Sequence, residues 1–124
     1  MQLASIRLVT SNVDTLVTFY AMLSGITPSR PSPDFAELRA GNGLVLAISS
    51  ERMIRQFNAG AAIAGANRSA IIEFNVADVD AVRSRLEGVD IDYAMQPADM
   101  PWGNRSMLLR DPDGNVVNIF SRPA

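Results

Sequence analysis

The sequence predicts an α+β fold of two βαβββ modules whose strands form a cup-shaped mixed sheet, with the helices on its outer face. Three observations predict it: the order strand, helix, three strands occurs twice, an Asn or Asp begins the helix of each repeat, and glycine-containing turns separate strands. A chain of 124 residues, 48% of them hydrophobic, can bury one substantial core. We therefore expect a single domain with modules over about residues 1–50 and 69–124 and a connection over 51–68.

The first module begins with a strand over Leu3–Thr10, where apolar side chains recur with a period of two. Asn12 is suited to accept hydrogen bonds from the first turn of an amphipathic helix, and Gly25 is suited to end that helix. Residues 26–34 contain three prolines, which indicates a weak edge strand and a loop. Two better strands follow at Phe35–Ala40 and Leu44–Ser49, joined by a Gly41-Asn42-Gly43 turn.

The second module repeats this order after a short helix over Glu51–Asn58 and a connection of small residues. A strand over Ala70–Val76 precedes Asp78, which is suited to cap the second helix, and Gly88 is suited to end it. Three more strands are expected at Val89–Met95, Asn104–Arg110 and Asn115–Ser121, with the turn Asp111-Pro112-Asp113-Gly114 between the last two.

The composition argues against several classes of function. A formal charge of -2 makes nucleic acid an unexpected partner, because phosphate binding needs clustered Lys and Arg. The absence of cysteine and histidine removes disulfides, thiolate catalysis and the commonest transition-metal ligands. No segment approaches the roughly 20 consecutive apolar residues of a membrane-spanning helix, so we expect no membrane partner and a cytoplasmic location.

Three stretches carry a resemblance to a known family. They are Asn12-Val13-Asp14 running into Phe19-Tyr20, Val76-Ala77-Asp78-Val79-Asp80, and Arg110-Asp111-Pro112-Asp113-Gly114-Asn115. Together they resemble the vicinal oxygen chelate superfamily, which includes glyoxalase I, bleomycin-resistance proteins and extradiol dioxygenases. The resemblance implies the two-module fold but leaves function open, because members are isomerases, dioxygenases, transferases or binding proteins. It also implies a homodimer, since related proteins form dimers and a second copy would cover exposed sheet edges.

Metal-using members of this superfamily hold their ion at places that can be matched to this chain. By the resemblance, Ser5, Ile71 and Asn118 correspond to ligands in the first strand, at the start of the second half and in the last strand, and Leu46 is the equivalent in the fourth strand of the first half. Ile71 and Leu46 cannot bind a metal ion, and a divalent site needs several converging nitrogen or carboxylate ligands. We therefore expect no metal site and no cofactor.

Strand alternation predicts which side chains face the cup. If Ile6, Leu8, Met107 and Leu109 pack under the helices, their chain neighbours point the other way. Apolar walls with a few polar groups are typical of a small-molecule pocket, although the same side chains could instead fill the interior or a dimer interface. The predicted cup residues are Ser5, Arg7, Val9, Ile71, Glu73, Asn75, Asn104, Ser106, Leu108, Val116, Asn118 and Phe120.

Two charged residues of this set, Arg7 and Glu73, are expected at corresponding depths of the two first strands. A structural ion pair is the simplest interpretation, because a charge removed from water needs a partner. If the pair is loose, Arg7 is a clamp for a ligand carboxylate or phosphate. Glu73 is the only carboxylate of the set and is therefore the candidate catalytic general base.

The single tryptophan, Trp102, lies between Pro101 and Gly103 in a loop just before a cup strand. Its indole could stack on a planar ligand, or it could simply cover the edge of the core. The candidate ligand-binding residues are therefore Ser5, Arg7, Glu73, Trp102, Asn104, Ser106 and Asn118.

We expect these residues to bind and sequester a small planar or aromatic compound without metal, as the resemblance to antibiotic-binding members implies. The alternative is a lyase, isomerase or dioxygenase-like enzyme that acts in the same cup, either with an unusual metal site built on Glu73 or without metal through Glu73 and Arg7. A third possibility is an interaction subunit whose cup is filled by protein.

Overall fold

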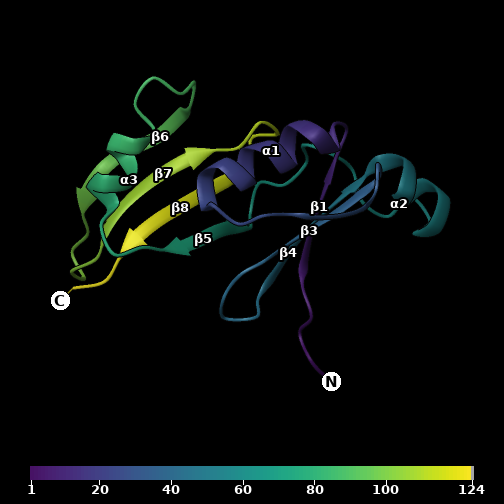
Figure 1. Ribbon diagram of the computed structural model, residues 1–124, viewed down its shortest axis with the longest axis horizontal. Coiled ribbons are helices and arrows are strands. Elements are labelled where there is room, and N and C mark those ends of the chain that lie inside the picture. Colours follow the sequence, from purple (N-terminus) through teal and green to yellow (C-terminus); the bar gives the residue numbers. More distant parts are fainter. Residues whose placement is uncertain (124) are drawn as a thin grey trace. The chain divides into compact units, whose positions relative to one another are not determined.

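The computed structural model describes residues 1–123 of the chain. It contains two compact units, Met1–Ala66 and Asn67–Ala124. Each unit holds one four-stranded mixed sheet and follows the predicted order of strand, helix and three strands (Figure 1). Within the described residues, no helix is long and apolar enough to cross a membrane.

The sheet of the N-terminal unit has the strand order β1-β4-β3-β2, with β1 parallel to β4 and the other pairs antiparallel. β1 begins three residues later than predicted, so Leu3 lies outside the sheet and is exposed. The strand starts at Ile6 because the parallel pairing of β1 with β4 begins there, with Ile6 opposite Leu46. The elements are β1 (Ile6–Thr10), α1 (Val13–Ser24), β2 (Ser29–Ser32), β3 (Phe35–Arg39), β4 (Val45–Ser50) and α2 (Glu51–Phe57).

Helix α1 forms as the sequence predicts. The Asn12 side chain accepts a hydrogen bond from the Thr15 N–H at 3.1 Å, which satisfies one of the free donors of the first turn. Gly25 ends the helix with a left-handed φ of 72°. Leu16 and Tyr20 are fully buried against the sheet, so this helix supplies much of the core of its unit.

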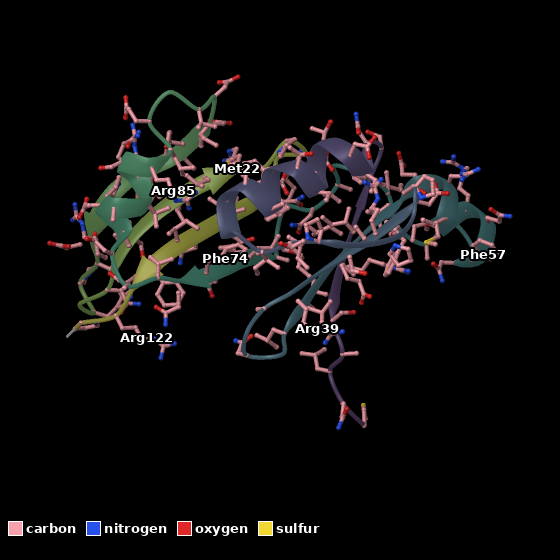
Figure 2. The ribbon with its side chains drawn as sticks, viewed as in Figure 1. Met22, Arg39, Phe57, Phe74, Arg85 and Arg122 are labelled. Atoms are coloured by element: carbon pink, nitrogen blue, oxygen red, sulfur yellow. The ribbon has the colours of Figure 1, made fainter. Side chains whose placement is uncertain are left out.

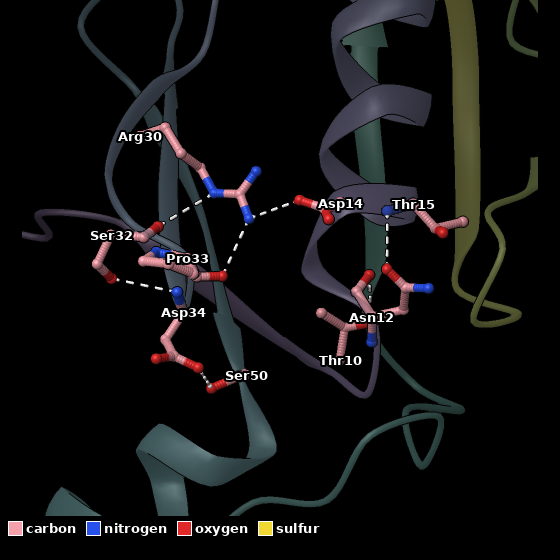
Figure 3. A network of polar contacts seen from close by, with 9 residues as sticks. All are labelled: Thr10, Asn12, Asp14, Thr15, Arg30, Ser32, Pro33, Asp34 and Ser50. Carbon is pink, nitrogen blue, oxygen red and sulfur yellow. Dashed lines mark hydrogen bonds and ion pairs between the residues drawn. The ribbon is translucent and has the colours of Figure 1, made fainter.

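Ion pairs fix the turn between β2 and β3 to its surroundings (Figure 3). Arg30 contacts Asp14 in the first turn of α1 at 2.8 Å and also donates to two carbonyl oxygens of the turn. Asp34 accepts a hydrogen bond from the Ser50 hydroxyl at 2.8 Å and pairs with Arg52 of α2. The hydrogen bonds from Arg52 and Ser50 lower the pKa of Asp34 below its usual value.

The sheet of the C-terminal unit has the matching order β5-β8-β7-β6, with β5 parallel to β8. β6 starts later than the predicted strand and extends further, through Pro97. An edge strand tolerates this proline because its pairing with β7 is interrupted by register shifts there. The elements are β5 (Ile71–Asn75), α3 (Val79–Arg85), β6 (Asp92–Asp99), β7 (Arg105–Arg110) and β8 (Val116–Ser121).

Helix α3 is short, and an ion pair links it to the sheet. Asp78 caps it by accepting from the Ala81 N–H at 3.1 Å, as predicted. Arg105 donates two hydrogen bonds to Asp80, at 2.8 and 3.0 Å, and a third to Asp99 at 3.1 Å. These bonds lower the pKa of Asp80 and raise that of Arg105. The side chains buried between α3 and the sheet include Val79, Leu86, Met107, Leu109, Val117 and Ile119.

The turn between β7 and β8 confirms the prediction made from its sequence. Asp111 is buried, and its carboxylate accepts hydrogen bonds from the backbone N–H groups of Asp113 and Asn115, at 2.8 and 2.9 Å, and from the Asn115 side chain at 2.7 Å. Gly114 has a φ of 84°, which a side chain would disfavour. The carboxylate of Asp111 therefore organises the turn itself.

Candidate ligand-binding site

The sheet of the C-terminal unit has one face covered by α3 and an opposite face, which we call the open face. Side chains alternate between the two faces, and the strand register identifies those that share the open one. They include every residue predicted for the cup in β5, β7 and β8. The members are Ile71, Glu73, Asn75, Asp92, Met95, Ala98, Ser106, Leu108, Arg110, Val116, Asn118 and Phe120.

A polar pair occupies the middle of the open face. Glu73 on β5 and Asn118 on β8 are register partners, and the Asn118 amide nitrogen donates to Glu73 Oε2 at 2.8 Å. Glu73 is exposed, whereas Asn118 Oδ1 is buried and has no hydrogen-bond partner among residues 1–123. An acceptor buried without a donor costs about 1–3 kcal/mol, so this atom marks a place where a donor would be stabilising.

Apolar side chains surround this pair. Leu108 and Val116 are half-buried neighbours on β7 and β8, and Ile71 at the start of β5 is 55% exposed. Phe120 lies two residues beyond Asn118 on the same face, about 7 Å further along the strand. The centre of the open face therefore combines a hydrogen-bonded polar pair with apolar neighbours, a mixture that suits an amphipathic small molecule.

One end of the open face carries a cation. Arg122 follows β8 and lies near the C-terminal end of the described chain (Figure 2). Its guanidinium carbon is 5.8 Å from the centroid of the Phe120 ring, which is within the range of a cation–π contact. Ser106, the register partner of Phe120 on β7, is buried. This end therefore combines an aromatic ring with a positive charge.

Trp102 lies at the tip of the β6–β7 hairpin and is 69% exposed. The hairpin is closed by hydrogen bonds from the Met100 N–H to the Asn104 carbonyl at 2.7 Å and from the Gly103 N–H to the Met100 carbonyl at 2.9 Å. Gly103 has a φ of 101°, and a Cβ there would lie 2.9 Å from Pro123. The exposed indole thus extends from a loop that packs against the segment after β8, and it does not cover the core.

The two candidates of the N-terminal unit, Ser5 and Arg7, are both exposed. Ser5 precedes β1 and belongs to no strand. Arg7 lies within β1, and its guanidinium donates to Asn58 Oδ1 at 2.9 Å, just beyond α2. Arg7 and Glu73 therefore each have a partner inside their own unit, and a contact between the two remains a prediction.

The residues at the matched positions do not fit the metal site found in metal-using members of the superfamily that the chain resembles. Leu46 pairs with Ile6 in register and faces α1, so the β4 residue on the opposite face is Ala47, which also cannot bind a metal. Glu73 is the only charged oxygen ligand near Asn118 on the open face. No group of three or more Asp, Glu, His or Cys side chains in residues 1–123 is arranged to hold a metal ion. These positions therefore offer hydrogen bonds rather than a coordination sphere.

Sequence reasoning did not find two partners that the structure shows. The sequence places Asn58 at a helix end and indicates no role for it, although its side chain is the acceptor for Arg7. Asn118 was expected on the open face, but not its hydrogen bond to Glu73. The register of β5 against β8 is the only signal that would have predicted the second contact, because the two residues are 45 positions apart.

The fold defines a class of protein, a two-module α+β protein in which each module holds one four-stranded mixed sheet. The family model for the Glyoxalase/Bleomycin resistance protein/Dioxygenase superfamily matches residues 2–119. The chain belongs to this superfamily, which confirms the resemblance drawn from its motifs.

Solved structures share this fold. A glyoxalase/bleomycin resistance protein/dioxygenase from Nocardioides is 25% identical, with a TM-score of 0.80 over 99% of this chain and 85% of that one. A glyoxalase-related enzyme from Fulvimarina pelagi is 22% identical, with a TM-score of 0.82 over 98% of this chain and 88% of that one. A superfamily enzyme from Burkholderia phytofirmans PsJN is 18% identical, with a TM-score of 0.82 over 98% of both chains. No curated protein matches the sequence with significance.

Proposed function

We propose that the protein binds and sequesters a small planar or aromatic compound on the open face of its C-terminal unit, without a metal ion. The observation that carries this proposal is the Glu73–Asn118 pair, joined at 2.8 Å in the middle of a sheet face that has apolar side chains on either side of the pair. Leu108 and Phe120 are half-buried and flank the pair, so a flat ring laid on them would bury apolar area while its polar atoms reach the pair.

The proposal that no metal takes part rests on the ligands that are available. The Asn118 nitrogen already donates to Glu73, and Asp92, the other carboxylate that the strand register places on the open face, pairs with Arg110. Zinc, nickel or iron titrated into the purified protein should therefore give no stoichiometric heat in calorimetry. A one-to-one isotherm in the submicromolar range that is lost in Glu73→Gln would contradict this part of the proposal.

The direct test is a calorimetric titration of the full-length chain with a set of planar aromatic amines, alcohols and acids. Phe120→Ala should weaken the binding of any compound that binds by about 2- to 12-fold, the equivalent of the 0.5–1.5 kcal/mol that aromatic stacking contributes. The matched control is Phe57→Ala, which removes a ring that is 69% exposed at the outer end of α2, in the other unit (Figure 2). Equal losses in both variants, or none in Phe120→Ala, would argue against this site.

The second candidate function is an enzyme of the lyase, isomerase or dioxygenase-like kinds found in the superfamily. It is favoured by the exposure of the Glu73 carboxylate, whose orientation is fixed by Asn118, as a general base requires. A general base at this position would exchange an acidic C–H proton of a bound ligand with deuterated solvent. Exchange by the wild type that is abolished in Glu73→Gln, with ligand affinity retained, would favour the enzyme over the binding protein.

A further inference from the structure

We infer that the Glu73–Asn118 pair selects ligands that carry a cationic N–H donor, such as a primary ammonium group, beside their planar ring. This inference rests on the proposed function and specifies the ligand class of the same face.

The first argument is the hydrogen-bonding capacity of the pair. Because a carboxylate only accepts hydrogen bonds, the Asn118 amide must direct its nitrogen, and not its oxygen, at Glu73 Oε2. One amide hydrogen is consumed by this contact. The pair then has one amide hydrogen left against two acceptor oxygens, Glu73 Oε1 and the buried Asn118 Oδ1, which has no donor among residues 1–123. Its free capacity is therefore mostly for donors.

The second argument is charge. Glu73 belongs to none of the ion pairs found within residues 1–123. Three arginines of its own unit pair with other carboxylates: Arg83 with Glu87, Arg105 with Asp80 and Asp99, and Arg110 with Asp92. Arg122, the cation at the end of the open face, lies over the Phe120 ring. A carboxylate without an ion-pair partner gains more from a charge-assisted hydrogen bond than from a neutral one.

One competing source of positive charge is Arg7, the partner that the sequence predicts for Glu73. Its guanidinium already donates to Asn58 in the N-terminal unit. If Arg7 neutralises Glu73, the two side chains are coupled energetically and the ligand needs no positive charge. If the ligand supplies the cation, the effects of Arg7→Gln and Glu73→Gln on the free energy of unfolding add within about 0.5 kcal/mol.

The experiment uses three compounds with one ring system and different charges: 2-(aminomethyl)naphthalene, 2-(hydroxymethyl)naphthalene and 2-naphthoate. Calorimetry with the full-length wild type at pH 7 should show the amine binding at least about tenfold more tightly than the alcohol, and the carboxylate binding most weakly. Glu73→Gln should bring the amine within about threefold of the alcohol while leaving the affinity for the alcohol unchanged.

Glu87→Gln is the matched control, because Glu87 is an exposed carboxylate of the same unit that pairs with Arg83. It should preserve the preference for the amine. Equal affinities of the wild type for all three compounds, or coupling between Arg7 and Glu73 in the double-mutant cycle, would overturn the inference and leave the proposed function intact. Failure of all three compounds to bind at millimolar concentration would overturn both.

Discussion

The two units share one topology but carry different side chains at matching places. The register of each first strand against the last strand of its module places Arg7 beside Ala47 in the N-terminal unit and Glu73 beside Asn118 in the C-terminal unit. Ala47 has no polar atom in its side chain, so Arg7 extends beyond the sheet to Asn58. Asn118 instead binds its neighbour within the sheet. A duplicated backbone therefore carries a candidate binding site only where the adjacent strand supplies a complementary side chain.

The helices differ in the same way. α1 has 12 residues and buries five of them, whereas α3 has seven residues and only Val79 is buried within it. The shorter helix makes fewer apolar contacts, and the hydrogen bonds from Arg105 to Asp80 supplement them. The N-terminal unit thus depends more on hydrophobic burial of its helix, and the C-terminal unit more on an ionic contact.

The largest expected effect is the loss of stability when a buried isoleucine of either core is replaced by alanine. Comparing the two losses tests whether both cores are equally tightly packed. Ile48 and Ile119 lie on the central strands β4 and β8 and are 0% and 2% exposed. Each substitution by alanine should lower the free energy of unfolding by about 2–5 kcal/mol, with the greater loss for Ile48 because α1 buries more side chains. Urea denaturation measures both.

Ile63→Ala is the control for these variants, since Ile63 is 69% exposed and its replacement should change stability by less than about 0.5 kcal/mol. A loss smaller than about 1 kcal/mol for either buried isoleucine would show that its unit repacks easily and would break the comparison.

The next effect concerns the ionic contact of α3. Arg105→Gln should lower the melting temperature more than Arg30→Gln, because Arg105 contacts two carboxylates and Arg30 only one. The folded-state pKa of Asp80 is lowered, so its contribution to stability is present above the usual pKa of about 4 and is lost as the pH falls through the folded value.

The melting-temperature difference between the wild type and Arg105→Gln should therefore be largest at neutral pH and should shrink below about pH 4. Thermal unfolding followed by circular dichroism at several pH values measures it. A difference that stays constant from neutral pH to pH 2 would assign the effect of Arg105 to packing instead of to its charge.

One feature is alike in both units, and it leads us to propose a homodimer. Ile6 and Ile71, at the start of the edge strands β1 and β5, are 54% and 55% exposed. Covering such side chains with a second copy would remove apolar surface from water. Sedimentation at micromolar concentration should give twice the chain mass of 13.4 kDa.

The variants Ile6→Lys and Ile71→Lys sharpen the comparison between the units. The substitution that converts the dimer into a monomer identifies the unit whose edge strand is covered by the second copy. Ile63→Lys serves as the control at a comparably exposed position outside the sheets. A wild-type monomer would contradict the homodimer.

The smallest expected effect is spectroscopic. Trp102 is the single tryptophan and lies in the C-terminal unit, so its emission should change only if a ligand reaches that unit. Compounds that bind in calorimetry should quench or shift the emission, and Trp102→Ala should bind them a few-fold more weakly if the indole stacks on them. Unchanged emission together with unchanged affinity in the variant would exclude the loop from the site.

Local signals predicted most of the fold. Asn12 and Asp78 cap the two main helices as expected, because a cap needs only the residue and the turn that follows it. The β6 strand was less predictable, since Pro97 normally excludes a strand and is accommodated here only by irregular pairing with β7.

The site was predictable in part. Alternation identified the side chains that share a face with Glu73, but not which of them it contacts. That choice depends on how β5 aligns with β8, and a shift of one residue would have placed a different side chain beside Glu73. The sequence also gave no indication that Asn58 would bind Arg7, because the two are 51 positions apart.

The turn organised by Asp111 bears on the order in which the chain folds. Its hydrogen bonds join residues no more than four positions apart, so the β7–β8 hairpin can close at little entropic cost. The parallel pairing of β5 with β8 requires a much longer loop, as the 45 positions between Glu73 and Asn118 illustrate. Long-range pairing slows folding, so we expect the hairpin to be structured in the transition state and β5 to join it afterwards. On this route the Glu73–Asn118 pair would be among the last contacts of its unit to form during folding.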